Sequence, residues 1–209
     1  MFDQMYLSGY NKALNGEGSE MAVDLGSARH WARELHREAI KPGGVCVDAT
    51  MGNGGDTAAF IQLSKPNGRV YAFDVQAQAI EQTKKRLDEM GLLGAQLFLC
   101  GHERMCEMIL ESVDVVAFNL GWLPGSVDKG ITTQSDTTIK ALEAACTLLK
   151  PGGLITICAY PGHEEGEREL QAVFHWAQEL NAARYQTMIR RYVNQSATAP
   201  VLIAVVKIR

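Results

Sequence analysis

A glycine-rich segment flanked by acids is the part of the sequence best suited to chemistry. It reads DATMGNGGDT from Asp48 to Thr57 and directly follows a short apolar run. Glycines let a backbone turn sharply into a helix and approach a ligand closely, and a helix N-terminus offers free N–H groups. Asp74 follows the next apolar run, twenty residues beyond Gly54, where a carboxylate can accept two hydrogen bonds from a ribose diol. Together these features predict a nucleoside-binding site.

The spacing of the glycines indicates which nucleoside cofactor fits. A dinucleotide fingerprint reads GxGxxG, but the sixth position counted from Gly52 is Thr57, so a pyrophosphate cradle is a poor match. An acid at Asp48 would also repel a pyrophosphate, whereas it suits a cation such as the ammonium of S-adenosylmethionine. The segment resembles the first motif of class I S-adenosylmethionine-dependent methyltransferases, and Asp74 resembles the second.

A third segment, NLGWLPG from Asn119 to Gly125, follows another apolar run. An asparagine side chain and the next backbone carbonyl, here Leu120, can accept hydrogen bonds from an amino group and direct its lone pair at a methyl group. The segment resembles the N-P-P-Y tetrad of amino-methylating enzymes, although Leu120 and Gly121 replace the two prolines. Trp122 is a candidate for stacking on a planar base, and packing within its own loop is the alternative.

Three histidines and a tyrosine are further candidates. His163, in the YPGH segment, is expected either to contact substrate or to cap the following helix. For His102, in the GHE segment, the alternatives are cofactor contact and helix capping. Tyr160 either stacks on the substrate base or packs beneath the loop, and His30 is more consistent with a packed or solvated residue than with a catalytic one.

The elements that must position these residues alternate between strands and helices. Strands are predicted over 45–49, 70–74, 96–100, 113–119 and 154–159, helices over 27–40, 58–63, 76–90, 102–110, 142–149 and 170–177, and late strands over 185–193 and 201–208. This order predicts an α/β fold, and the resemblance of the motifs implies that it is the Rossmann-like fold of class I methyltransferases. Its mostly parallel seven-stranded sheet would carry helices on both faces and a C-terminal antiparallel pair. Right-handed crossovers bring the C-terminal ends of the parallel strands to one edge, called the rim, where ligands bind.

Composition limits the classes of protein to consider. With 46% hydrophobic and 21% charged residues in 209, the chain is of ordinary globular make-up, and we expect an N-terminal extension (1–26) before one domain (27–209). No apolar run is long enough to span a membrane, and the first twenty residues do not read as a secretory signal. The five cysteines form no CxxC pair and mostly lie in apolar runs, which indicates buried thiols, no metal site and a cytoplasmic protein.

Taken together, the motifs resemble one bacterial family that carries the label rRNA methylase and is associated with tRNA wobble-uridine modification. The matching segments are VDATMGNG (47–54), Asp56-Thr57, FNLG (118–121), LPG (123–125), Lys129, Thr132-Thr133 and YPGH (160–163), with His30, Asn194-Gln195 and Pro200. One departure is Gly55, where the family is expected to have a histidine. The resemblance covers about residues 25–209. It implies methylation of the amine of 5-aminomethyl-2-thiouridine, giving the 5-methylaminomethyl form.

The residues of these segments are expected to have three roles. The Asn119 side chain and the Leu120 carbonyl are expected to orient the substrate amine. The expected cofactor-binding residues are Asp48, Met51, Gly52, Asn53, Gly54, Asp56, Thr57, Asp74, Val75, Gln76, Gly101, His102 and Asn119. The expected substrate-binding residues are Gly121, Trp122, Leu123, Pro124, Gly125, Lys129, Thr132, Thr133, Tyr160, His163 and Asn194.

The expected partner is the anticodon loop of tRNA, whose wobble uridine is single-stranded and can enter a pocket. Because 24 acids outnumber 20 bases, phosphate contacts must be local. Candidates for these contacts are Lys129, Lys140, Arg184, Arg190 and Arg191. A homodimer is compatible with the late apolar strands. The alternatives are a methyltransferase for rRNA or a small amine, a non-catalytic nucleotide-binding module and, less favoured, a dehydrogenase.

Overall fold

Seven strands form a single sheet at the centre of the protein. The computed structural model describes residues 24–121 and 132–209. The strands are β1 (Val45–Asp48), β2 (Arg69–Asp74), β3 (Ala95–Leu99), β4 (Val113–Asn119), β5 (Leu149–Ala159), β6 (Tyr185–Arg190) and β7 (Val201–Lys207). Their order is β3-β2-β1-β4-β5-β7-β6. Strands β1 to β5 are parallel to their neighbours, and β7 is antiparallel to both β5 and β6. The predicted fold class, with its C-terminal antiparallel pair, is confirmed.

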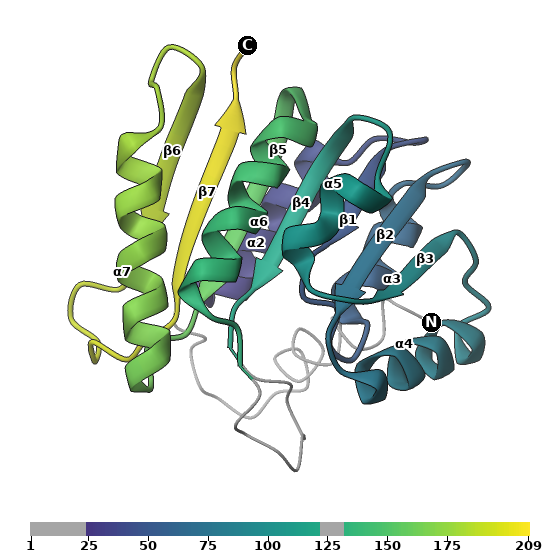
Figure 1. Cartoon of the computed structure of the whole chain (residues 1–209), viewed down its shortest axis with the longest axis horizontal. Helices are drawn as coiled ribbons and strands as arrows, with labels where there is room; N and C mark the ends of the chain where they lie inside the picture. The colour runs from purple at the N-terminus through teal and green to yellow at the C-terminus, as the bar shows by residue number, and fades with distance from the viewer. Residues whose placement is uncertain (1–23, 122–131) are drawn as a thin grey trace, which may run out of the picture.

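Helices cover both faces of the sheet (Figure 1). The helices are α2 (Ala28–Ala39), α3 (Gly55–Leu63), α4 (Ala77–Glu89), η1 (His102–Arg104), α5 (Met105–Met108), α6 (Ser135–Leu148) and α7 (Glu164–Glu179). Consecutive strand residues point to opposite faces: Val47 packs in a core with α5, α6 and α7, and Cys46 packs in a second core with residues of α3 and α4. All four residues of β1 are buried because both faces are covered. The face that carries α2, α3 and α4 is called the α2 face.

Local sequence accounts for the helices that lead to the rim. The Ser27 hydroxyl accepts a hydrogen bond from the His30 N–H (3.1 Å), so α2 begins where the sequence predicted a cap. Helix α3 begins earlier than predicted, immediately after Gly54. Gly54 has φ +71°, and a Cβ there would lie 2.7 Å from the Thr83 hydroxyl. A side chain is therefore excluded from the turn by both conformation and space.

The start of β5 differs from the prediction. The predicted helix over 142–149 and the predicted strand over 154–159 leave the KPGG segment (150–153) between them, but β5 already begins at Leu149. Val113 pairs with Leu149, whereas Val115 pairs with Leu154, so extra residues of β5 bulge out between these two pairs. Gly152, at φ +81°, lies within this irregularity. A Pro-Gly segment was thus accommodated inside a strand at the edge opposite the rim.

Other expectations concern the ends of the chain and the cysteines. Of the expected extension 1–26, residues 1–23 lie outside the described residues. Cys46 and Cys158 are buried, as expected, and burial raises the pKa of both thiols to about 12. Cys100 and Cys146 are partly buried and Cys106 is exposed, so the expectation of buried thiols is wrong for Cys106. Within residues 24–121 and 132–209, no helix has the length and apolar character needed to cross a membrane.

Candidate active site

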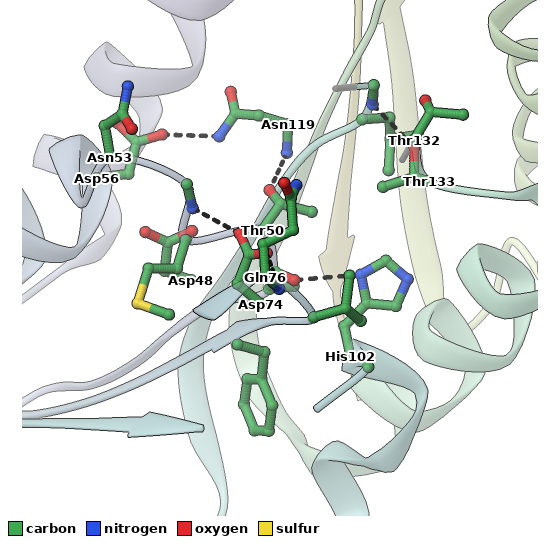
Figure 2. A pocket seen from close by; sticks show the side chains of 18 of the residues that line it. Asp48, Thr50, Asn53, Asp56, Asp74, Gln76, His102, Asn119, Thr132 and Thr133 are labelled. Atoms are coloured by element: carbon green, nitrogen blue, oxygen red, sulfur yellow. Dashed lines mark hydrogen bonds between the residues drawn. The ribbon is translucent and has the colours of Figure 1, made fainter. Parts of the chain in front are cut away.

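A cavity of about 810 Å³ opens at the rim, a size typical of ligand pockets. Loops after β1, β2, β3, β4 and β5 contribute to its wall, together with α2. Figure 2 shows several of the lining side chains, among them Asp48, Asp74 and Asn119. The residues predicted from the sequence that line it are Asp48, Met51, Gly52, Asn53, Asp56, Asp74, Val75, Gln76, Gly101, His102, Asn119, Leu120, Gly121, Thr132, Thr133, Tyr160 and His163. Residues distant in sequence therefore meet at the rim, as predicted from the shared direction of the parallel strands.

A few predicted residues lie elsewhere. Gly54 and Thr57 stand just behind the cavity wall, where they shape the turn and hold Asp48. Asn194 is exposed in the segment between β6 and β7 and does not line the cavity. The predicted residues Trp122, Leu123, Pro124, Gly125 and Lys129 lie outside the described part of the chain.

Asp74, at the end of β2, is held by two backbone amides. The Gly52 N–H donates to its Oδ2 (2.9 Å) and the Gln76 N–H donates to its Oδ1 (2.9 Å) (Figure 2). Each carboxylate oxygen can accept a further hydrogen bond. The carboxylate is only partly buried and lines the cavity. Its position thus suits two further donors, such as the hydroxyls of a ribose.

Asp48, at the end of β1, is 1% exposed. The Thr57 hydroxyl donates to its Oδ2 (2.7 Å), whereas its Oδ1 has no hydrogen-bond partner among the described residues. Burial, reinforced by the nearby charge of Asp56, raises the pKa of Asp48 to about 7. A buried carboxylate oxygen without a donor, in the wall of a cavity, suits a cationic group of a ligand.

Asn119, at the end of β4, is oriented by a second acid. Its Nδ2 donates to Asp56 Oδ2 (2.8 Å), and its backbone N–H donates to the Thr50 hydroxyl (2.6 Å) (Figure 2). An ionised carboxylate can only accept, so the amide nitrogen of Asn119 must face Asp56. The Asn119 Oδ1 is consequently left as an acceptor in the cavity wall.

Two arginines of α2 were missed by the sequence analysis. Arg29 and Arg33 lie 3.8 and 3.5 Å from Asp56 Oδ1, and both line the cavity. Their spacing of four residues places them on one face of a helix, which was the available signal. Asp56 therefore connects the α2 arginines to the amide of Asn119.

His102 lines the cavity but is largely buried. Its Nδ1 lies 3.1 Å from the Ala49 carbonyl oxygen, and its ring packs edge-on against Phe118. Burial lowers the pKa of His102 below its ordinary value, which favours a neutral ring. Because a carbonyl only accepts, the proton is on Nδ1 and Nε2 is an acceptor. The alternative, that the His102 side chain caps a helix, is not observed, because no side chain makes a capping hydrogen bond to η1.

His163 does what the capping alternative predicted. Its Nδ1 accepts a hydrogen bond from the Gly166 N–H (3.0 Å) at the start of α7, and its side chain also borders the cavity. Tyr160 packs against the small core that contains Cys158 and lines the cavity as well. His30 is partly buried, packs edge-on against Trp31 and does not line the cavity.

The basic residues predicted to contact phosphates do not all lie at the rim. Tyr185 pairs with Lys207 and Arg190 pairs with Leu202, so β6 runs toward the rim. Arg184 therefore lies at the opposite edge, and its inclusion was wrong because the direction of β6 could not be read from composition. Arg190 is at the rim, with its guanidinium 3.5 Å above the Trp31 ring.

Among the described residues, no three His, Cys, Asp or Glu side chains are grouped as a metal site requires. The strand order, the acids after β1 and β2, and the glycine turn between them define a class I S-adenosylmethionine-dependent methyltransferase.

Comparison with known proteins identifies the family. The family model described as "Putative rRNA methylase" matches residues 70–206, and the chain belongs to this family. It is 39% identical over 189 residues to "tRNA (mnm(5)s(2)U34)-methyltransferase, chloroplastic" of Arabidopsis thaliana, covering 84% of this chain and 68% of that protein. It also matches "Ribosomal RNA small subunit methyltransferase H" of Desulfotalea psychrophila with 44% identity, but only over 52 residues, 25% of this chain and 18% of the relative.

Solved structures agree with this assignment. A "putative rRNA-methylase" from Clostridium thermocellum superposes with a TM-score of 0.86 and 34% identity, covering 88% of this chain and all of that one. A methyltransferase from Streptococcus mutans, solved with S-adenosylhomocysteine (SAH), has a TM-score of 0.80 and 30% identity, covering 88% and 99%.

The cofactor is S-adenosylmethionine, and the residues of the cavity fit it. The amide-held Asp74 suits the ribose, and the buried Asp48 oxygen without a donor suits the ammonium. The glycine turn allows the backbone between them to approach the ligand closely.

Proposed function

We propose that this methyltransferase methylates the amine of 5-aminomethyl-(2-thio)uridine at the wobble position of tRNA, giving 5-methylaminomethyl-(2-thio)uridine. The observation that carries the proposal is the orientation of Asn119, whose Oδ1 is left as an acceptor because its Nδ2 is bonded to Asp56. The name of the Arabidopsis relative supports the same substrate.

The residues after β4 suit a primary amine. Such an amine resembles a lysine, with a pKa near 10.4 in water, so it must lose a proton before it can attack. Burial in a cavity lowers that pKa, and hydrogen-bond acceptors select and orient the neutral form. We assign the two acceptor roles to Asn119 Oδ1 and the Leu120 carbonyl. No described residue donates a hydrogen bond to that carbonyl.

S-adenosylmethionine, when bound, supplies an electrophilic methyl group, and attack by the amine nitrogen releases SAH and one proton overall. The protein holds the reacting atoms in line and excludes water. Asp74 and Asp48 would hold the donor, while Asn119 and Leu120 would hold the amine. His102, whose pKa is lowered by burial, also lines the cavity, and a strong base is not required by this arrangement.

The rim on the α2 face offers contacts for RNA phosphates. Arg29 is 44% exposed and lines the cavity, and Arg190 and Arg191 follow at the end of β6. Arg190 stacks on Trp31 and also donates to the Leu25 carbonyl (2.9 Å), so its charge is held in place. The first turn of α7, on the other face, is acidic. This asymmetry supports approach of a phosphate backbone from the α2 face.

The proposal is tested by nucleoside mass spectrometry. In a strain that lacks this protein, tRNA should accumulate 5-aminomethyl-2-thiouridine, and adding the purified protein with S-adenosylmethionine should convert it to the methylated nucleoside. An Asn119→Ala variant serves as the inactive control. Unchanged tRNA nucleosides in that strain, or methyl transfer to ribosomal RNA instead, would contradict the proposal.

A further inference from the structure

A buried acid behind the cavity is bonded to the segment after β4. Glu169 of α7 is 2% exposed and does not line the cavity. The Thr138 hydroxyl donates to its Oε1 (2.6 Å), and the Thr133 hydroxyl donates to its Oε2 (2.7 Å). Burying a carboxylate is costly unless its oxygens are satisfied, and here each oxygen has a hydroxyl donor. The two hydroxyl donors indicate that Glu169 does more than fill space in the core.

Thr133 connects Glu169 to the backbone after β4 through two hydrogen bonds. A hydroxyl has one proton. The proton of Thr133 goes to Glu169, so its oxygen can only accept in the remaining direction. The donor that it meets there is the Gly121 N–H, at 2.8 Å. The carboxylate of Glu169 thus determines the hydrogen-bond direction of a peptide that lines the cavity.

Fixing the Gly121 N–H also fixes the Leu120 carbonyl, because both belong to one planar trans peptide and point in opposite directions. This peptide needs an external constraint. Gly121 has φ +125°, and nothing lies within 4 Å of where its Cβ would be, so local sterics do not restrict the rotation. The flanking peptides are held by the bond from the Leu120 N–H to the Cys158 carbonyl (2.9 Å) and by the bond from the Thr133 N–H to the Gly121 carbonyl (3.3 Å). The Gly121 N–H itself is held by the Thr133 hydroxyl, and through it by Glu169.

We propose that Glu169 is a positioning residue for methyl transfer. Through Thr133 it holds the Leu120–Gly121 peptide so that the Leu120 carbonyl can accept a hydrogen bond from the substrate amine. This inference rests on the proposed function, in which that carbonyl is one of two acceptors for the amine. It changes the expected role of Thr133, whose hydroxyl is engaged by Glu169 and Gly121 rather than being directed at substrate.

Three variants separate this role from simple packing. Thr133→Val keeps the shape of the side chain and loses the hydroxyl. Thr133→Ser keeps the hydroxyl and should behave like the wild type in both readouts below. Glu169→Gln leaves one acceptor oxygen for two threonine hydroxyls. Thr147→Val is the matched control, since the Thr147 hydroxyl bonds only the Glu143 carbonyl on an exposed turn of α6.

The first readout needs neither cofactor nor substrate. Amide hydrogen exchange followed by NMR should show a protected Gly121 N–H in the wild type, in Thr133→Ser and in Thr147→Val. In Thr133→Val it should exchange about ten-fold faster or more, because the acceptor is lost. In Glu169→Gln it should also exchange faster than in the wild type, because one acceptor oxygen then serves two threonine hydroxyls. A Gly121 amide that exchanges as slowly in Glu169→Gln as in the wild type would remove Glu169 from the positioning role. A Gly121 amide that exchanges equally fast in the wild type and in Thr133→Val would overturn the inference.

The second readout is the single-turnover rate of methyl transfer to tRNA. Thr133→Val should be slower by about ten- to a hundred-fold, while the dissociation constants for SAH and for tRNA stay within about two-fold. An unchanged rate in Thr133→Val, with an active wild type, refutes the positioning role and leaves the proposed function intact. A wild type that does not methylate this tRNA refutes the proposed function. The exchange comparison then still decides whether Glu169 and Thr133 hold the peptide.

Discussion

Replacing Asp74 with asparagine tests the cofactor site with almost no change in shape. Both carboxylate oxygens of Asp74 accept backbone N–H groups at 2.9 Å, one from Gly52 and one from Gln76. An asparagine has one oxygen and one NH₂ group, so its NH₂ would face one of these N–H donors. The variant therefore cannot present two acceptors to a ribose while keeping both backbone bonds.

The expected loss follows from the hydrogen bonds involved. A hydrogen bond to a charged group contributes about 1.5–3 kcal/mol. Loss of one such bond to the ribose should weaken SAH binding by about 10- to 150-fold, since about 1.4 kcal/mol corresponds to ten-fold. Titration calorimetry with SAH and with S-adenosylmethionine measures this directly.

Asp88→Asn provides the matched control. Asp88 is exposed in the last turn of α4, at the end of that helix away from the rim, so the same loss of charge should leave binding unchanged. A folded Asp74→Asn variant that binds SAH within two-fold of wild type would show that the acid after β2 does not contact the ribose. The assignment of this end of the cavity would then fail.

Three further outcomes are expected. Asn119→Ala should bind SAH within about two-fold of wild type but lower the single-turnover rate by about a hundred-fold, the scale for loss of an oriented group; an unchanged rate would remove Asn119 from catalysis. Burial raises the pKa of Asp48 to about 7, so the ligand-free carboxyl is protonated below that pH and ionised above it. SAH affinity, measured by calorimetry, should therefore rise about ten-fold from pH 6 to pH 8, and Asp48→Asn should abolish this dependence. Arg191→Ala should weaken tRNA binding and reduce the slope of log affinity against log salt by about one, whereas Arg184→Ala, at the opposite edge, should not.

Much of the fold was predictable because most of the strands are short, largely apolar runs bounded by turn residues. Strand β4 was predicted with its observed ends, Val113 and Asn119, and β1 and β2 to within a residue at each end. The start of β5 was not predictable, since proline and two glycines after a helix ordinarily mark a loop. Only the pairing with β4 accommodates them as a bulge.

The candidate site was predictable to the extent that it follows from strand ends. Parallel strands bring Asp48, Asp74 and Asn119 to one rim whatever else the chain contains. The hydrogen-bond partners of the site residues could not be predicted in this way. The amide of Asn119 bonds an acid 63 positions earlier, and Thr133 bonds Glu169, which lies 36 positions later. Hydrogen bonds between side chains so distant in sequence leave no local periodicity, so they became visible only in the structure.

The two acids that were not recognised as positioning groups act in the same physical way. Asp56 accepts a hydrogen bond from the Asn119 Nδ2, which leaves the Asn119 Oδ1 as an acceptor. Glu169 accepts from the Thr133 hydroxyl, which in turn accepts from the Gly121 N–H and so orients the Leu120 carbonyl. The proposed site therefore offers a nucleophile two acceptors. A primary amine has two N–H bonds to match them and a lone pair left for attack, whereas a hydroxyl has one proton and an aromatic carbon offers none. This matching favours an amino group over oxygen or carbon as the methyl acceptor, independently of the names of relatives.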